Sequence, residues 1–201
     1  MITTLFCDIG NVLLYFSHQR ALQQVAEICR IRSEDLWEHI TEKQLDIHYE
    51  IGRITTQQLY KSIVSIAKTS PSYASLIDAW CDIFTPNETI VPVIKSLKAQ
   101  GMRLILLSNI GESHYDFILR NYEIVQDFDY SILSYKVGIM KPHQGIFEAA
   151  IKAADDNPQQ CFYIDDIPEY VAAARKFGID AEQYVNTPTL KEHLLQRGIA
   201  N

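Results

Sequence analysis

Short apolar runs alternate with amphipathic stretches along most of this chain, and that alternation constrains its fold more than any other feature. Four runs have the length and apolar character of buried strands, namely residues 3–7, 103–107, 131–134 and 161–164, and a fifth strand is expected at 183–185. The stretches between them repeat apolar residues at helical spacing. Strands that alternate with helices are typical of a parallel sheet covered by helices. The sequence therefore predicts an α/β fold with a parallel sheet flanked by helices.

Three of the predicted helices have ends that the sequence marks. Glycine is common just past a last helical turn, and proline is favoured in a first turn. An apolar stripe over residues 93–97 stops before Gly101, and a helix that begins at Pro168 stops before Gly178. A third helix is expected around residues 146–151. Each of these helices would connect two predicted strands, as a parallel sheet requires.

The first half of the chain interrupts this alternation, because it contains several helical patterns but no convincing strand. Thr55 and Gln58 have the spacing of a capping box at a helix start, and Ser33 is expected as the N-cap of another helix. The chain is therefore expected to have two parts: an α/β core of residues 1–16 and 86–201, and an inserted α-helical segment of residues 17–85.

The charge balance excludes two classes of partner. The 201 residues include 18 Lys and Arg against 25 Asp and Glu, a formal charge of −7. Nucleic-acid binders need a basic face and proteins held on anionic membranes need basic clusters, so neither partner is expected. No apolar run approaches the ~20 residues that span a bilayer, and no segment typical of a signal peptide precedes Asp8. We therefore expect a cytoplasmic protein.

The cysteines are consistent with that compartment. Cys7, Cys29, Cys81 and Cys161 are scattered, without a CxxC or CxxH pair. Because structural zinc sites usually use such closely spaced pairs, we expect buried free thiols in a reducing environment instead.

Polar side chains follow each of the first four predicted strands. In order, they are a carboxylate, a hydroxyl with an amide, an ammonium and a pair of carboxylates: Asp8, Ser108 with Asn109, Lys141, and Asp165 with Asp166. Ligands of open parallel sheets bind beyond the carboxyl ends of the strands, so these groups are expected to meet in one crevice.

This set of groups suits phosphoryl transfer. A carboxylate such as Asp8 can act as the nucleophile, and Lys141 with Mg²⁺ can supply the positive charge that attack on a phosphate needs. Mg²⁺ prefers hard oxygen ligands and keeps several waters, so two or three carboxylates and the Gly10 carbonyl would suffice. Taken singly, each residue also has a structural explanation, as a helix cap, a turn residue or an exposed lysine.

The order Asp8, Ser108, Lys141 and Asp165-Asp166 resembles the four motifs of the haloacid dehalogenase superfamily, over nearly the whole chain. The helical insertion after the first motif is similar to the small α-helical cap of that superfamily, whose core is a Rossmann-like parallel sheet. The strings CDIGNVL, LSN and MKP look closest to the branch that contains α-D-glucose-1-phosphate phosphatase.

The resemblance implies a role for each matching residue. Asp8 would be the nucleophile and a Mg²⁺ ligand together with the Gly10 carbonyl, Asp166 and, directly or through water, Asp165. Ser108 would hydrogen-bond the phosphoryl group with support from Asn109. Lys141 would neutralise the phosphate and hold Asp8 ionised.

One position departs from the pattern of most phosphatases in that superfamily. They carry a second Asp two residues after the nucleophile as general acid and base, and this chain has Gly10 there. General acid–base catalysis is typically worth about 10²–10⁴-fold, and its loss matters least for a good leaving group. The glucose-1-phosphate phosphatase branch resembles this chain in having glycine. Compensation by His18, His48 or His143 is one option, although histidines are often plain surface residues.

Two other functions compete with a phosphatase. A 2-haloacid dehalogenase also lacks the second Asp and needs no metal, but such enzymes typically lack an acidic pair like Asp165-Asp166. Those carboxylates would repel Asp8 unless a cation were present, which favours a Mg²⁺ enzyme. The other alternative is a phosphate-ligand-binding regulatory protein that has lost turnover, and Gly10 is the feature that supports it.

The resemblance implies a small phosphorylated metabolite, such as a sugar phosphate, as the substrate. The insertion would select it. Five aromatic residues in or beside the insertion either line the pocket or form its core: Tyr15, Phe16, Trp37, Tyr49 and Trp80.

Overall fold

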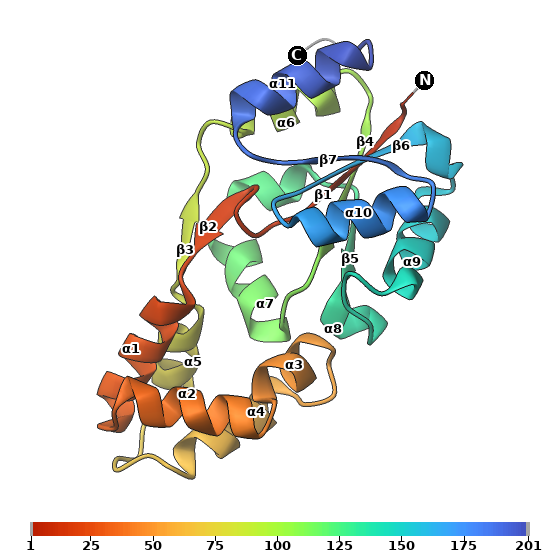
Figure 1. The fold of residues 1–201 in the computed structure, drawn as a ribbon. Helices are drawn as coiled ribbons and strands as arrows, with labels where there is room; N and C mark the ends of the chain where they lie inside the picture. The colour runs from red at the N-terminus through yellow and green to blue at the C-terminus, as the bar shows by residue number, and fades with distance from the viewer. Residues whose placement is uncertain (1, 200–201) are drawn as a thin grey trace.

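The structure is a computed structural model that describes residues 2–199, and a five-stranded parallel sheet lies at its centre (Figure 1). The strand order is β5-β4-β1-β6-β7. The strands are β1 Thr4–Cys7, β4 Arg103–Ser108, β5 Tyr130–Leu133, β6 Cys161–Asp165 and β7 Asp180–Gln183. The predicted α/β fold is confirmed. The fifth strand begins three residues earlier than expected and ends at Gln183.

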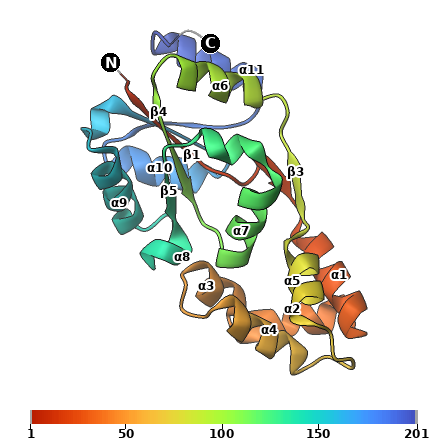
Figure 2. The ribbon, with the colours of Figure 1, turned by 180° about the vertical axis from the view of Figure 1, so that it is seen from behind.

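Alternate residues of the central strands face opposite layers of helices, as a pleated sheet requires. In β4, Leu104 and Leu106 belong to one buried apolar cluster, and Ile105 and Leu107 belong to the other. Helices α6, α7 and α11 complete the first cluster, and α9 and α10 complete the second. Their bounds are α6 Val91–Ala99, α7 Glu112–Asn121, α9 Gln144–Ala154, α10 Pro168–Lys176 and α11 Thr187–Gln196. Helix α10 lies in front of the strands in Figure 1, whereas α7 lies in front in Figure 2, the view from behind.

The inserted segment is helical, and it is joined to the core by a ribbon that the sequence did not predict. Its helices are α1 His18–Cys29, α2 Ser33–Glu42, α3 Leu45–Glu50, α4 Thr56–Val64 and α5 Tyr73–Cys81. The capping box of Thr55 and Gln58 is present at α4. The expected N-cap at Ser33 is wrong, because Ser33 is the first helical residue and Arg32 is the N-cap, without a side-chain hydrogen bond.

The unpredicted ribbon is a pair of antiparallel strands at the two ends of the insertion, β2 Leu14–Phe16 and β3 Phe84–Pro86. Strands of three residues are too short to show a period in the sequence. The remaining elements are the short helix α8 Ser134–Val137 and the 3₁₀ turns η1 Glu123–Asp127 and η2 Pro158–Gln160. The ribbon brings both ends of the helical insertion to the carboxyl end of β1.

Helices α3 and α4 hold the insertion against helix α7 of the core. The Tyr49 hydroxyl donates a hydrogen bond to Ser113 Oγ at 2.7 Å and accepts one from the Ser113 backbone N–H at 2.6 Å. Thr56 Oγ1 donates to Glu112 Oε2 at 2.7 Å. A Cβ on Gly111 would lie 2.2 Å from the Tyr49 ring, so this close approach depends on glycine. Figure 2 shows α3 between the other inserted helices and α8.

All four cysteines are free and buried, as the sequence predicted. Within residues 2–199, no helix has both the length and the hydropathy that crossing a bilayer demands.

Candidate active site

A buried lysine lies between two carboxylates at the carboxyl ends of β1 and β6. Lys141 Nζ is 3.0 Å from Asp8 Oδ1 and 2.6 Å from Asp165 Oδ2, and it donates a further hydrogen bond to the Leu107 carbonyl at 3.0 Å. The lysine is 1% exposed, and Asp165 is fully buried. The three charged groups therefore form one ion cluster, which we call the floor (Asp8, Lys141 and Asp165).

Asp165 is fixed by contacts to both of its oxygens. Its Oδ2 accepts hydrogen bonds from Lys141 Nζ and the Tyr163 hydroxyl, and its Oδ1 accepts one from the Ile167 backbone N–H at 2.8 Å. A buried carboxylate is stable only when it is paired and hydrogen-bonded in this way. Asp165 therefore holds Lys141 in place beneath Asp8.

Electrostatic interactions in the floor raise the pKa of Lys141, and burial raises the pKa of its neighbour Asp8. Burial raises the pKa of Asp8 from 3.8 to about 6, with Asp165 adding to the rise, while Lys141 and a hydrogen bond from Ser108 lower it. Burial lowers the pKa of Lys141, but Asp8 and Asp165 outweigh that effect and raise it above 10.5. Above about pH 6 the floor thus presents an ionised Asp8 next to a charged ammonium.

The same crevice can hold a divalent cation. Carboxylate oxygens of Asp8, Asp165 and Asp166 all lie within 4.8 Å of one another. Asp166 is half-buried, burial raises its pKa, and its Oδ2 accepts a hydrogen bond from Asn11 Nδ2 at 3.0 Å. Because hard oxygen donors at this spacing suit Mg²⁺, the residues fit the predicted metal.

Ser108 and Asn109 follow β4 as expected, but their side chains are used differently. Ser108 is buried at the cavity wall and hydrogen-bonds Asp8. Asn109 Oδ1 accepts from the Lys141 backbone N–H at 2.7 Å, and its Nδ2 donates to the Lys141 carbonyl at 3.0 Å. The Asn109 amide therefore positions the backbone that carries Lys141.

These groups open into a cavity of about 190 Å³, which we call the Asp8 cavity. The structure brings all of the predicted site residues to it except Asp165, which is fully buried behind Lys141 and is not part of the lining. Its lining consists of Asp8, Gly10, Asn11, Phe16, His18, Glu50, Ser108, Asn109, Lys141, Asp166, Ile167 and Tyr170. Sequence reasoning missed Asn11, Glu50 and Tyr170. Asn11 had a signal, since it lies in the loop of the first motif, whereas no pattern pointed to the other two.

Of the three histidines considered as substitutes for an acid at position 10, one reaches this cavity. His18 lines it, whereas His48 and His143 are not among the lining residues. His143 is the N-cap of α9, where its Nδ1 accepts a hydrogen bond from the Gly145 N–H at 3.1 Å.

The Asp8 cavity continues toward the insertion. His18 and Glu50 also line a second cavity of about 150 Å³ between α1, α2, α3 and α5, the cap chamber. Most of its other lining side chains are apolar: Ala21, Leu22, Trp37, Ile40, Ile47, Tyr49 and Trp80, with Asp46 and His114. A small cavity of about 60 Å³ shares His18 and Glu50 with both. Tyr49 and Trp80 are thus both chamber lining and buried core.

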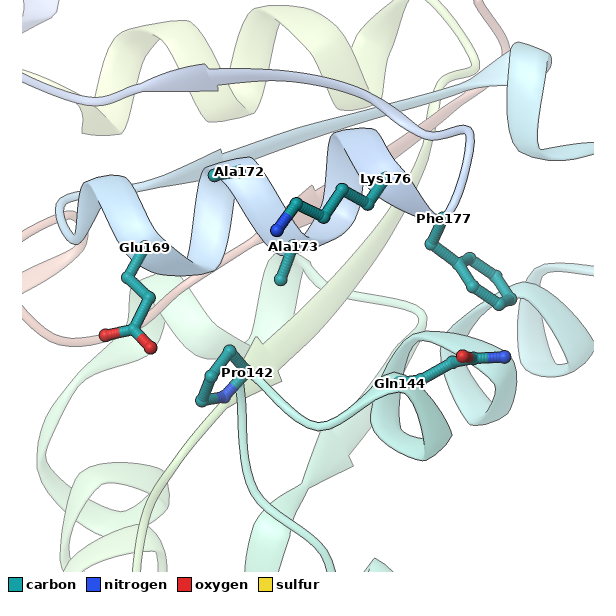
Figure 3. A pocket seen from close by; sticks show the side chains of 7 residues that line it. All are labelled: Pro142, Gln144, Glu169, Ala172, Ala173, Lys176 and Phe177. Atoms are coloured by element: carbon teal, nitrogen blue, oxygen red, sulfur yellow. The ribbon is translucent and has the colours of Figure 1, made fainter.

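A larger hollow of about 480 Å³ lies along α10 (Figure 3). Its charged lining residues are Glu169 and Lys176, and it shares no residue with the Asp8 cavity. Figure 3 shows Glu169 near Pro142 at one end and Phe177 near Gln144 at the other. No cluster of convergent polar groups marks it as a reaction site.

Two curated proteins show how far the sequence similarity extends. Haloacid dehalogenase-like hydrolase domain-containing protein 3 of Xenopus laevis is 25% identical over 166 residues, which are 82% of this chain and 63% of that protein. The chain therefore spans less than two thirds of that relative. Sesquiterpene phosphatase astK of Aspergillus oryzae is 23% identical over 182 residues, 86% of this chain and 84% of that protein.

Two solved structures share the fold. The HAD family enzyme bt-2542 of Bacteroides thetaiotaomicron, in complex with magnesium and inorganic phosphate, superposes with a TM-score of 0.76 at 22% identity, over 91% of this chain and 94% of that one. L-2-haloacid dehalogenase of Xanthobacter autotrophicus superposes with a TM-score of 0.64 at 17% identity, over 100% of this chain and 85% of that one.

A family model described as haloacid dehalogenase-like hydrolase matches residues 2–178. The superfamily that the motifs predicted is thereby confirmed, while the branch with glucose-1-phosphate phosphatase stays a prediction. This chain belongs to the haloacid dehalogenase-like hydrolase family.

Proposed function

We propose that this protein is a magnesium-dependent phosphomonoester hydrolase that acts through a phosphorylated Asp8. The observation that carries the proposal is the floor, where Lys141 lies within 3.0 Å of both Asp8 and Asp165, and where these two carboxylates and Asp166 are spaced for a divalent cation. The magnesium and phosphate bound by the related Bacteroides enzyme and the name of the Aspergillus relative support the same chemistry.

The residues divide the work of the reaction. Asp8, held ionised by Lys141, would attack phosphorus through a carboxylate oxygen. Lys141 and the Ser108 hydroxyl would bind the phosphoryl oxygens. Asp8, the Gly10 carbonyl and Asp166 would hold Mg²⁺, with Asp165 as a direct or water-mediated ligand. Bound Mg²⁺ supplies positive charge that stabilises the transferring phosphoryl group.

We assign the choice of substrate to residues 17–85, acting as a cap on a core of residues 1–16 and 86–201. A small phosphometabolite such as a sugar phosphate follows from the branch that the motifs resemble. The cap chamber adds an independent indication, because its mainly apolar lining favours an alcohol with an apolar portion. Both kinds of phosphate ester therefore belong in a substrate panel.

Hydrolytic dehalogenation is the alternative, and the shared fold with a haloacid dehalogenase keeps it open. Asp166 argues against it, because a half-buried carboxylate beside Asp8 and Asp165 is costly without a cation.

A panel of sugar and apolar phosphomonoesters, assayed with and without Mg²⁺, tests the proposal. We expect magnesium-dependent release of inorganic phosphate, and a loss of about 10⁴-fold or more in Asp8→Asn, which keeps the shape but removes the nucleophile. Chloride release from 2-chloropropionate without metal would establish the dehalogenase instead. Phosphate esters that raise the melting temperature without being hydrolysed would indicate a binding protein.

A further inference from the structure

Glycine at position 10 offers no side chain to donate a proton, and an acid there would have to displace the Phe16 ring. A Cβ added to Gly10 would lie 2.8 Å from Cε1 of Phe16, closer than packed carbon atoms approach. The Phe16 ring is itself flanked by the rings of His18 and Phe84, at centroid distances of 4.9 and 6.4 Å. A proton donor for the leaving group must therefore come from another part of the molecule.

Glu50 occupies the place where such a donor is needed. It is the last residue of α3, and it lines the Asp8 cavity, the cap chamber and the small cavity between them. His18 is the other titratable residue that lines all three, whereas Asp8 and Asp166 line only the first of these cavities and Asp46 only the second. With phosphorus at Asp8 and the organic group in the chamber, the bridging oxygen would lie at this junction.

The neighbouring residue fixes this position. Tyr49 is 2% exposed and is bound to the core by its two hydrogen bonds with Ser113. The Glu50 carboxyl itself forms no hydrogen bond or ion pair within residues 2–199, and it is half-buried. Its backbone is thus held while its carboxyl is left available to a ligand.

The surroundings of Glu50 favour its protonated form. Burial raises the pKa of Glu50 from 4.5 to about 7, with Asp46 and Asp8 adding to the rise and Lys141 opposing it. For His18, on the same side of the cavity, burial lowers the pKa below 6.5 despite the opposing charge of Asp46. The remaining titratable neighbours in the cavity are Asp166 and Tyr170. Near neutral pH, Glu50 therefore keeps a proton to give more often than His18 does.

We propose that Glu50 of the insertion is the general acid and base of this enzyme, in the role that position 10 cannot fill. This inference rests on the proposed function. In the first step an Asp8 oxygen bonds to phosphorus, the bond from phosphorus to the ester oxygen breaks, and that oxygen takes the proton of Glu50 and leaves as the alcohol. In the second step the Glu50 carboxylate takes a proton from water, whose oxygen bonds to phosphorus while the bond from phosphorus to the Asp8 oxygen breaks. Inorganic phosphate, the Asp8 carboxylate and protonated Glu50 result.

A pair of substrates of similar size tests the proposal. The p-nitrophenolate ion leaves without a proton, whereas the alkoxide of 2-phenylethyl phosphate needs one. We expect Glu50→Gln to lower kcat/KM for 2-phenylethyl phosphate by about 10²–10⁴-fold. The loss for p-nitrophenyl phosphate should be smaller by a factor of about ten or more. The decline of alkyl-ester kcat/KM above the Glu50 pKa of about 7 should vanish in the variant. Glu50→Asp, which keeps a shorter acid, should give an intermediate loss.

The control is Glu42→Gln, because Glu42 is an exposed carboxylate of α2 that lines none of these cavities. Glu42→Gln should leave the ratio of kcat/KM for the two substrates unchanged. Equal losses on both substrates in Glu50→Gln would mean that Glu50 has a structural role, and a selective loss in His18→Gln but not in Glu50→Gln would assign the proton to the histidine. Either result overturns the proposal. If the wild-type protein hydrolyses neither ester, the proposed function itself fails.

Discussion

The floor of the Asp8 cavity and its cap side are built in opposite ways. On the floor, Lys141 alone makes three polar contacts of 3.0 Å or less, and Asp165 uses both of its oxygens. The cap side consists of Phe16, His18 and Glu50: two rings packed edge to face, and a carboxyl without a hydrogen bond or ion pair among residues 2–199. Charges held in fixed positions suit the phosphoryl transfer step, which is the same for every phosphate ester. A cavity wall with few polar contacts can accept substitutions that change which substrate fits.

The difference also separates two carboxyl groups whose pKa values are both raised. Burial raises the pKa of Asp8 to about 6, although its ion pair with Lys141 lowers it. Burial raises the pKa of Glu50 to about 7, and Glu50 forms no ion pair within residues 2–199. A nucleophile needs to be ionised and a general acid needs its proton. The two sides of the cavity thus favour opposite protonation states between about pH 6 and 7.

Lys141→Met should give the largest effect, because it leaves Asp8 and Asp165 buried without their shared cation. We expect a destabilisation of about 3–5 kcal/mol near neutral pH and a loss of about 10³-fold in kcat/KM. Because Lys141 lowers the Asp8 pKa, the variant's carboxyl takes up its proton at a higher pH than in the wild type, so the destabilisation should shrink as the pH falls toward about 6. Urea unfolding at several pH values and kinetics with saturating Mg²⁺ measure these effects.

The matched control is Lys152→Met, since Lys152 is an exposed lysine of α9. It should shift the free energy of unfolding by no more than about 0.5 kcal/mol. A Lys141→Met protein as stable as this control would show that the floor is not an ion cluster in solution.

Asp166→Asn should give the second-largest effect. It tests metal binding separately from the ion cluster of Asp8, Lys141 and Asp165. Asp166 is half-buried and contacts Asn11, whereas Asp165 holds Lys141. We expect the Mg²⁺ concentration for half-maximal rate to rise about 10–100-fold, with a smaller change in substrate KM. A Mg²⁺ titration at saturating substrate measures it, and an unchanged metal requirement would remove Asp166 from the ligands.

Gly10→Asp tests the boundary between the two sides, because its side chain would meet Phe16. The 2.8 Å approach predicts a destabilisation of about 1–3 kcal/mol and no gain in rate on alkyl phosphates. In a double-mutant cycle with Phe16→Ala, removal of the ring should recover part of that loss, with a coupling of about 0.5–3 kcal/mol. Strictly additive losses would mean that another contact excludes the side chain.

The two carboxylates of the floor could be predicted from their place at strand ends, whereas the cap side could not; Lys141 follows β5 only after helix α8. Asp8, Ser108 and Asp165 each lie at the end of an apolar run that forms a strand, and parallel pairing then brings the strand ends together. The same reasoning gave the sheet and the helices on both faces. It predicted the residues of this region because they are local consequences of a repeated pattern.

Glu50 has no such signal, since its position depends on contacts between distant parts of the chain. Helix α3 has six residues, too few to show a period, and Tyr49 bonds Ser113 across a separation of 64 residues. The ribbon of β2 and β3, which carries Phe16 to Gly10, was missed for the same reason. Docking of the insertion on the core is a tertiary event that local propensity does not determine.

The smallest predicted effect concerns the stability cost of ionising Glu50. Its pKa in the folded protein is about 7 against an ordinary value of 4.5, so the folded state binds more protons than the unfolded chain between these values. Stability should therefore fall as the pH rises through that interval, and Glu50→Gln should remove this loss. Because the side chain is only partly buried, we expect a gain on the order of 1 kcal/mol at about pH 8 and none near pH 4.5.

Urea unfolding in EDTA at these two pH values measures the gain, and the contributions of Asp8 and Asp166 cancel because both proteins contain them. Glu42→Gln should show no such pH dependence, since that carboxyl is exposed. A gain of equal size at both pH values would trace to packing rather than to charge. A loss at about pH 8 would mean that the ionised Glu50 has a partner, and the cap side would then resemble the floor.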